Sequence, residues 1–599
     1  MTDDVLCQRD LEFLLYEWLD ISALTSRDRF AEHSRETFDA VLELSADIAI
    51  KEFAPHNKKA DQNQPVMRPD GTVEMIDEVG HALEIFAKAG LMSGQFDEEL
   101  GGMQLPATVA RAAMAWLQAA NASTASYPLL TMANANLLAE YGTASQIDEY
   151  VRPMLEGRYF GTMCLSEPQA GSSLADITTR ATRQDDGTYR VSGTKMWISG
   201  GDHELSDNIV HLVLAKTPDG PPGIKGISLF IVPKYLPEAD GSSGERNDVT
   251  LIGLNHKMGN RGTTNTHLAF GDGTHSPRGK AGAVGFLVGE EGRGLSYMFH
   301  MMNEARVGVG MLATVLGYTG YRKSLAYAKV RAQGRLVGVK DPLSPPVPII
   351  EHPDVRRMLL AQKSYVEGAM ALNLYCARLV DDAATAPEPD ARDAAALLLD
   401  VLTPIAKSWP SQWCLEANSL AIQVHGGYGY TTDYDVEQHY RDNRLNPIHE
   451  GTHGVQGLDL LGRKVVMQGG AGMALLGAEI EKTVGRGREL GGQAAAHAEE
   501  LGAAWTQVVE TTMRLWSTGD PAVALANSSL YLESFGHVVI AWIWLEQLVA
   551  AGDKEGAFYD GKRAAARFFY TFELPKVAQQ LTTLASLDTL LLDTDPNCF

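Results

Sequence analysis

The 599-residue chain is poor in cysteine and in basic residues, and each shortage argues against a class of protein. Its 5 cysteines are scattered, and no two form a Cys-x-x-Cys pair. We therefore expect reduced, mostly buried thiols rather than a zinc ribbon or a disulfide framework. With 51 Lys and Arg against 75 Asp and Glu, the net charge is −24. Such an acidic chain disfavours a nucleic-acid backbone or an anionic membrane as partner.

Long apolar runs are also missing. No stretch of about 20 apolar residues is present, so no membrane-spanning helix is predicted. The most apolar stretch, Val538–Leu545, stops at Glu546 and indicates part of a core helix. The sequence begins with the acidic Met1–Asp4, where a signal or transit peptide would be basic. We therefore expect a cytoplasmic protein without a targeting segment.

Apolar residues (45%) and charged residues (21%) are present in the amounts usual for a globular protein. The length favours about four domains. Because the sequence pattern changes along the chain, we predict four domains in succession. They are a helical domain over residues 1–160, a β domain over 161–290, a second helical domain over 291–466 and an additional helical domain over 467–599.

Apolar residues at helical spacing mark the first, third and fourth domains. The clearest helical segments of the first domain are Ser34–Phe53, Ala107–Ala119 and Leu129–Glu140. Proline removes helix hydrogen bonds and glycine weakens helices, so clusters of either predict interhelical breaks. These breaks fall at Pro342–Pro353, Ala386–Pro389, Gly469-Gly470 and Gly491-Gly492.

Short β-rich runs distinguish the second domain, which we expect to be a compact antiparallel β domain over Gly161–Gly289. The predicted strands include Tyr189–Gly193, Ile209–Leu214 and Gly226–Val232. Asp185-Asp186-Gly187 predicts a hairpin turn. Two glycine-rich segments, 239–244 and 271–282, predict polar loops.

Five polar or glycine-containing segments stand out from this framework. They are Cys164–Ser173, Lys195–Gly201, Lys257–Gly262, Gln423–Tyr430 and Arg441–Thr452. Turns of this kind can present N–H groups and hydroxyls to an anionic ligand, although each alone is equally well explained as a polar loop. In this order and at these separations, the segments resemble the acyl-CoA dehydrogenase family of flavoproteins, from Phe30 to Lys464.

The resemblance implies an α+β fold. It would comprise an N-terminal helical domain, a middle antiparallel β-barrel-like domain, a C-terminal four-helix bundle and an additional C-terminal helical domain, as in the large branch of the family. It further implies FAD as cofactor, acyl-CoA as substrate and electron-transfer flavoprotein as electron acceptor. We expect a homodimer, and we expect no metal site.

The family removes the α-proton of an acyl-CoA thioester with a glutamate, and Glu450 matches this base. Burial would raise the pKa of such a carboxylate and make it a stronger base. Some members place the base on another helix, at the position that is Ala305 here, which cannot ionise. Glu304, one residue earlier, is turned about 100° around the helix and should face away. The resemblance therefore assigns the base to Glu450.

The resemblance also assigns cofactor and substrate contacts. The residues expected to bind FAD are Met163, Leu165, Ser166, Gly171, Ser172, Trp197, Ser199, Arg331, Gln423, Gly426, Gly427 and Thr452, of which Arg331, Gln423, Gly426 and Gly427 would reach the FAD of a neighbouring subunit. Those expected to bind substrate are Ser172, Asn303, Arg306 and Gly451. After Arg331 the sequence departs from the family pattern and continues into the proline-rich insertion.

Several activities share this framework. The leading hypothesis is α,β-desaturation of acyl-CoA in fatty-acid β-oxidation. Oxidation of 3-methylmercaptopropionyl-CoA is the first alternative, since hydrophobic pockets separate such similar chains by only about 1–3 kcal/mol. An acyl-CoA oxidase is the second. A DNA-associated flavoprotein is the third, but the basic residues of the last domain are balanced by acidic ones, so binding of nucleic acid is not expected.

Overall fold

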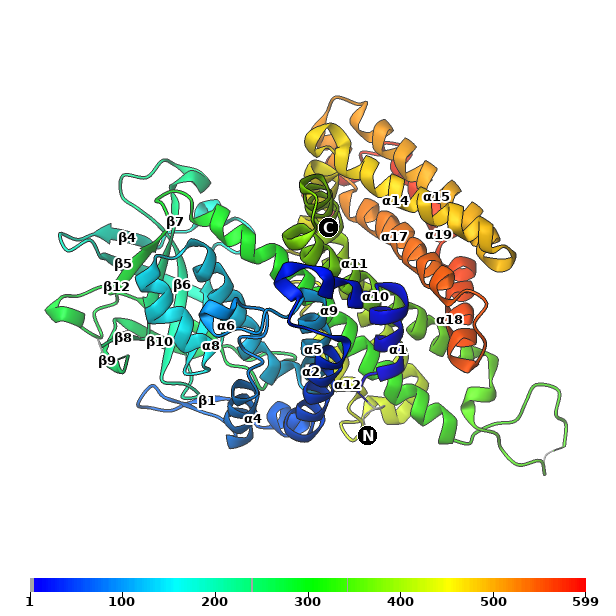
Figure 1. Cartoon of the computed structure of the whole chain (residues 1–599), viewed down its shortest axis with the longest axis horizontal. Coiled ribbons are helices and arrows are strands. Elements are labelled where there is room, and N and C mark those ends of the chain that lie inside the picture. Colours follow the sequence, from blue (N-terminus) through cyan, green and yellow to red (C-terminus); the bar gives the residue numbers. More distant parts are fainter. Residues whose placement is uncertain (1–4, 239–240, 342) are drawn as a thin grey trace. The chain divides into compact units, whose positions relative to one another are not determined.

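The computed structural model describes residues 5–238, 241–341 and 343–599, without the side chains of 300–303. The chain forms two compact units (Figure 1). The sheet unit comprises Ala40–Leu105 and Trp116–Ala305. The helical unit comprises Met1–Asp39, Pro106–Ala115 and Arg306–Phe599. The helices α2 (Arg35–Ile48), α5 (Ala107–Ala120) and α9 (Gly294–Val330) each run from one unit into the other.

An eight-stranded sheet forms the centre of the sheet unit, in the order β10-β11-β5-β12-β7-β6-β3, with β4 paired to β5 and β6. Its strands are β3 (Tyr159–Cys164), β4 (Arg180–Arg183), β5 (Tyr189–Ser199), β6 (Asn208–Lys216), β7 (Ile227–Pro233), β10 (Val249–Leu254), β11 (Asn265–Phe270) and β12 (Ala283–Val288). The sheet is antiparallel, as predicted, except where β6 pairs in parallel with β3 and, through one residue pair, with β4. A parallel pair needs a long crossover, and the chain from Leu165 through the β4–β5 hairpin supplies it.

Both faces of the sheet are buried, which explains its nearly continuous apolar strands. On β6, Leu212 and Leu214 join a core cluster that includes Leu137 and Leu138 of α6 (Ala122–Tyr141). The alternate residues Val213 and Ala215 join a second cluster. Successive side chains of a strand point to opposite faces, so one strand contributes to two cores.

Smaller elements complete the sheet unit. They are α3 (Asn57–Gln62), β1 (Val66–Met67), β2 (Val73–Glu74), α4 (Asp77–Lys88), α7 (Ala144–Gln146), α8 (Arg152–Leu155), β8 (Tyr235–Pro237) and β9 (Ser243–Arg246). The prediction of a loop over 239–244 is wrong for its last two residues, because Ser243 pairs with Pro237 and begins β9. Residues 239 and 240 lie outside the described residues.

Long helices build the helical unit, and the predicted breaks between them are confirmed. Its helices are α1 (Gln8–Glu12), most of α9, α10 (Pro353–Thr385), α11 (Pro389–His425), α12 (Val436–Asn443), α13 (His453–Asp459), α14 (Ala471–Leu490), α15 (Gly492–Trp516), α16 (Pro521–Leu525), α17 (Ser528–Ala551), α18 (Ala557–Phe568), α19 (Lys576–Ala585) and α20 (Leu590–Asp593). The proline-rich insertion separates α9 from α10, and the second proline cluster separates α10 from α11.

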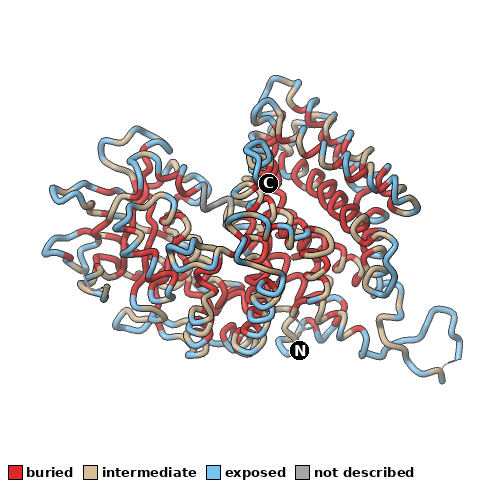
Figure 2. The backbone as a smooth tube through the Cα atoms, in the orientation of Figure 1, coloured by how far each residue is buried: buried red, intermediate tan, exposed pale blue. Residues whose placement is uncertain are grey.

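Helix α17 is the most apolar long helix of this unit. By length and composition alone it could cross a membrane, although its most apolar 18-residue window is 89% buried. It packs against α14, α15 and α19, and the tube along it is mostly red in Figure 2. Trp542 on this helix donates a hydrogen bond to Thr483 of α14 at 2.8 Å. The predicted core helix at Val538–Leu545 is therefore confirmed.

Candidate active site

The loop between α12 and α13 carries Glu450 in an unusual backbone conformation. Glu450 has φ +51° and Gly451 has φ +91°, both in the left-handed region. Such a conformation is uncommon for a residue other than glycine, and strained residues of this kind cluster at active sites. Glycine is favoured at Gly451 by this φ, and a Cβ atom there would also lie 2.4 Å from Nε2 of Gln456 and displace that side chain. Glu450 lies two residues before the N-cap Thr452 rather than inside the helix.

Hydrogen bonds from buried side chains hold this loop. Nε2 of Gln456 donates to the Glu450 carbonyl at 3.0 Å. Nζ of Lys407 donates to the carbonyls of Asn446, at 2.8 Å, and Gly451, at 2.6 Å. Thr452 accepts a hydrogen bond from the Val455 N–H at 3.4 Å and so caps α13. The left-handed turn at Glu450 is therefore fixed from both sides.

The electrostatics of the loop suit a base. Burial raises the pKa of Glu450, and the charges of Arg306 and Lys407 partly oppose this rise. Burial also lowers the pKa of Lys407 to about 7, while Glu450 opposes that change. A carboxylate with a raised pKa binds a proton more strongly and is a better general base near neutral pH.

Arg306, predicted on the substrate side, is buried and already paired. Its Nη1 lies 3.0 Å from Oδ2 of Asp459, while its buried Nε has no hydrogen-bond partner among the described residues. Glu304 accepts a hydrogen bond from Nδ2 of Asn136 at 2.8 Å, within the sheet unit. The side chain of Asn303, the other predicted substrate contact on α9, lies outside the described residues.

In the sheet unit, the end of β3 lies beside β5 and brings several predicted flavin contacts together. The Met196 N–H donates to the Ser166 carbonyl at 3.0 Å, which joins the loop after β3 to β5. Ser199, at the end of β5, accepts a hydrogen bond from Nδ2 of Asn265 at 3.2 Å. Met163 and Leu165 are half-buried, whereas Gly171 and Ser172 are exposed in the loop.

Trp197 lies at a β-bulge. Two residues of β5, Met196 and Trp197, lie opposite the single residue His267 of β11. Trp197 has φ +67° and is 61% exposed, although its neighbours Lys195 and Ile198 are buried. Bulges redirect side chains and are common beside active sites. An exposed tryptophan held in this way fits contact with a planar ring such as the flavin of FAD.

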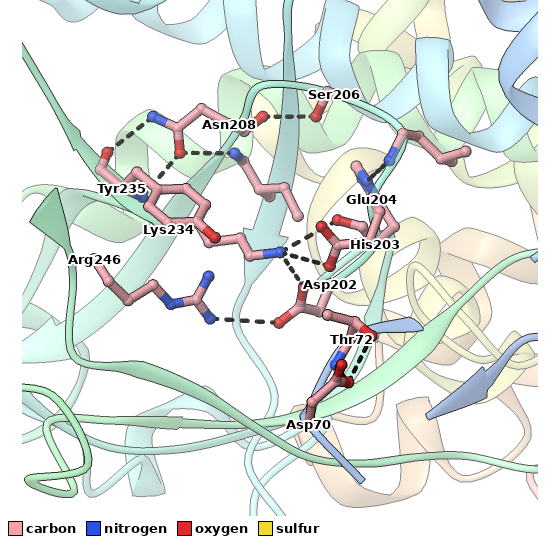
Figure 3. Close-up of polar contacts among 12 residues, drawn as sticks. Asp70, Thr72, Asp202, His203, Glu204, Ser206, Asn208, Lys234, Tyr235 and Arg246 are labelled. Carbon is pink, nitrogen blue, oxygen red and sulfur yellow. Dashed lines mark hydrogen bonds and ion pairs between the residues drawn. The ribbon is translucent and has the colours of Figure 1, made fainter. Parts of the chain in front are cut away.

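Two buried lysines support this part of β5. Nζ of Lys195 donates to the Leu165 carbonyl at 2.9 Å and to Oε1 of Glu167 at 3.0 Å. Nζ of Lys234 binds Asp202 at 2.6 Å, the His203 carbonyl at 3.2 Å and Glu204 at 3.4 Å. Figure 3 shows Lys234 pointing into the turn that follows Ser199. The predicted flavin contacts on β5 therefore lie between two anchored segments.

The helical unit contains a cavity of about 600 Å³. Three of the predicted FAD contacts, Arg331, Gly426 and Gly427, line it, whereas Gln423 is exposed and is not among its lining residues. The guanidinium of Arg331 lies 5.7 Å from the ring centre of Tyr428. A cation beside aromatic rings suits an anionic, heteroaromatic ligand such as the adenosine diphosphate part of FAD.

Sequence reasoning missed the residues that support these sites. They are Gln456 and Lys407 around Glu450, Lys234 beyond β5, and Tyr327, Gln333 and His352 in the cavity wall. Only Gln333 and His352 carried a signal, because Gln333 lies where the sequence departs from the family pattern after Arg331 and His352 lies within the proline-rich segment. Within residues 5–238, 241–341 and 343–599, no group of three or more His, Cys, Asp and Glu side chains could hold a metal ion.

Four successive segments of the chain match known domain families. Residues 35–158 match the acyl-CoA dehydrogenase N-terminal domain, 162–272 its middle domain and 292–465 its C-terminal domain. Residues 476–595 match a domain described as "acetyl-CoA dehydrogenase C-terminal like".

Two curated relatives and one solved structure extend over nearly the full length. The 3-methylmercaptopropionyl-CoA dehydrogenase of Ruegeria pomeroyi is 36% identical over 94% of both chains. The broad-specificity linear acyl-CoA dehydrogenase FadE5 of Mycobacterium tuberculosis is 33% identical over 99% of both. Caenorhabditis elegans ACDH-11, solved with C11-CoA, shares the fold with a TM-score of 0.75 at 19% identity, over 95% of this chain and 89% of its own. The chain therefore belongs to the acyl-CoA dehydrogenase family of FAD-dependent flavoproteins.

Proposed function

We propose that the protein oxidises acyl-CoA thioesters to trans-2-enoyl-CoA in fatty-acid β-oxidation, with Glu450 as the base. The observation that carries this proposal is the Glu450 loop. It combines a left-handed carboxylate residue, a pKa raised by burial and buried donors that hold the loop. A carboxylate that served only as a helix cap would need neither the unusual backbone nor the raised pKa.

The role of Glu450 follows from the weak acidity of the α-proton. A base for this proton must be desolvated and held in position. The Glu450 carboxylate takes the proton from the α-carbon, and its main-chain N–H is available to stabilise the enolate oxygen, as the family resemblance implies. FAD supplies the hydride acceptor for the β-hydrogen when it is bound. Trp197, Ser199, Ser166 and the loop through Ser172 would hold its flavin end.

The helical-unit cavity, with Arg331, Gly426 and Gly427, would hold the adenosine diphosphate end of a FAD. By resemblance to the family, this FAD belongs to a neighbouring subunit, and we propose a homodimer. Electron-transfer flavoprotein is the proposed electron acceptor, and the cytoplasm the proposed location. An oxidase would use the same base and would differ by steady production of H2O2 in air.

Two observations bear on the substrate. A relative that acts on 3-methylmercaptopropionyl-CoA is 36% identical, and a broad-specificity relative is 33% identical. An alkyl chain and a thioether chain of similar size differ little in an apolar pocket, by about 1–3 kcal/mol. We propose a broad range of acyl chains, with 3-methylmercaptopropionyl-CoA as the second candidate.

The test is an anaerobic titration of the purified flavoprotein, in which flavin absorbance is followed. Esters from butyryl-CoA to palmitoyl-CoA are added, together with 3-methylmercaptopropionyl-CoA. We expect one or more esters to bleach the flavin, and Glu450→Gln to abolish bleaching while retaining FAD. A protein with full FAD content that no ester bleaches would contradict the proposal.

A further inference from the structure

One buried lysine from a different helix closes the loop that carries the base. Lys407 lies in the middle of α11 and is fully buried. Its Nζ donates to the carbonyls of Asn446 and Gly451, at 2.8 and 2.6 Å. These two carbonyls mark the two ends of the segment Asn446–Gly451. A single ammonium group therefore joins both ends of the loop that presents Glu450.

The loop needs such a clamp because its backbone is not self-supporting. Glu450 and Gly451 follow one another in the left-handed region, at φ +51° and +91°. Residues other than glycine stay in this region only where surrounding contacts hold them. Gln456 holds the Glu450 carbonyl, but it comes from α13, directly after the loop. Lys407 supplies the contact that ties the loop to a long, separate helix.

We propose that Lys407 is a positioning residue for the reaction. It clamps both ends of the Asn446–Gly451 loop and places its positive charge near Glu450, and so fixes and tunes the carboxylate that accepts the α-proton. This inference rests on the proposed function of Glu450.

Among the charged and titratable groups around the loop, Lys407 is the cation that also binds the loop backbone. The positive charges of Arg306 and Lys407 both lower the pKa of Glu450, against the effect of burial. Arg306 is already paired with Asp459, at 3.0 Å. Burial, and secondarily the Lys407 charge, lowers the pKa of His449 to about 3 and of His453 to about 4, so both imidazoles are neutral near pH 7. Because burial lowers the pKa of Lys407 to about 7, its ammonium is charged over the acidic limb of the pH profile, where its charge acts on Glu450.

Three variants separate the clamp from the charge. Lys407→Met removes both, whereas Lys407→Gln keeps an N–H donor without the charge. Lys464→Met is the matched control, because Lys464 is a buried lysine of the same unit whose partner is the carboxylate of Asp400. The measurements are the anaerobic rate of flavin bleaching as a function of pH, the Kd of the acyl-CoA ester and the melting temperature.

For Lys407→Met we expect bleaching to slow roughly 10- to 100-fold while the ester's Kd stays near the wild-type value. The acidic limb of the pH profile, where Glu450 becomes protonated, should move to higher pH, because Glu450 loses a cation that lowers its pKa. Lys407→Gln should recover part of the rate and keep the shifted limb. Lys464→Met should keep the wild-type bleaching rate and acidic limb, although loss of its pair with Asp400 lowers the melting temperature.

An unshifted acidic limb in both Lys407 variants would overturn the inference, because loss of packing alone slows the reaction without moving the limb. Bleaching of Lys407→Met at the wild-type rate would overturn it as well. If Lys407→Met does not fold, the position of the acidic limb in the pH profile of Lys407→Gln decides between the proposed role and a loss of packing. A wild-type protein that no ester bleaches would refute the proposed function instead, so the two failures are distinct.

Discussion

Lys195 and Glu167 form an ion pair with 3.0 Å between Nζ and Oε1, and both side chains are almost fully buried. The pair joins β5 to the loop after β3, on which Ser166 and Ser172 lie. Glu167 also accepts hydrogen bonds from the main-chain N–H groups and hydroxyls of Thr178 and Thr179. One carboxylate thus fixes the start and the end of the loop. The same Nζ fixes the Leu165 carbonyl at 2.9 Å.

The first prediction concerns FAD affinity. Lys195→Met leaves the buried charge of Glu167 without its cation and releases the Leu165 carbonyl. We expect FAD to dissociate at least roughly 10-fold more readily, since each lost buried contact of this kind costs about 1–3 kcal/mol. Fluorescence of released flavin on dilution measures this. The control is Lys88→Met, which removes an exposed lysine of the same unit that pairs with Glu84 one turn away on α4 and does not touch the loop. Equal FAD retention in the two variants would contradict the prediction.

The second prediction concerns acid stability. Against the effect of burial, the Lys195 charge and the bonds from Thr178 and Thr179 lower the pKa of Glu167 from 4.5 to about 2. The folded state therefore favours the charged carboxylate. The resulting stabilisation is complete above pH 4.5 and is lost as the pH falls towards 2. We expect the melting temperature of the wild type to fall more steeply from pH 5 to pH 3 than that of Glu167→Gln. Parallel curves would show that Glu167 contributes no such stabilisation.

The third prediction concerns the turn at the base. Gly451→Ala places a Cβ atom 2.4 Å from Nε2 of Gln456 and puts alanine at φ +91°. Gln456 must then release the Glu450 carbonyl or the strained turn must shift, and a displacement of the base by about 1 Å costs roughly 100-fold in rate. We expect FAD content to stay normal while bleaching by acyl-CoA slows by about that factor. Gly454→Ala is the control, because its Cβ would approach only Oγ1 of Thr452, at 3.9 Å. Similar rates in both variants would contradict the prediction.

Glu450 could be predicted from sequence because the residues around it form a contiguous segment. Lys407 could not, because it lies on another helix among buried apolar residues, and only the fold brings it to the loop. The same holds for Lys234, whose partners lie on the turn after β5. The predicted strands Tyr189–Gly193 and Ile209–Leu214 form parts of β5 and β6. The parallel pairing of β3 with β6 could not be foreseen, because strands buried on both faces carry no alternation from which to infer their neighbours.

The last prediction concerns a buried charge cluster in the helical unit. Lys562 of α18 forms ion pairs with Asp10 of α1 and with Glu367 of α10, and all three side chains are nearly fully buried. Asp10 also accepts a hydrogen bond from the Tyr318 hydroxyl at 2.9 Å. The cluster therefore ties the first helix to the additional C-terminal domain. Removing a central cation leaves two buried carboxylates without it, and breaking a buried pair costs about 3–5 kcal/mol.

We therefore expect Lys562→Met to lower the melting temperature of the protein clearly, and the α1 segment to become the first site of limited proteolysis. Lys576→Met serves as control, because Lys576 is half-exposed at the start of α19 and pairs with Glu573, three residues before it. The flavin of the surviving folded Lys562→Met protein should still be bleached by acyl-CoA, because the cluster contains no residue of the Glu450 loop. If the two variants melt together, the cluster is not what holds α1 in place. If bleaching is lost from folded protein, it acts on the active site as well as on stability.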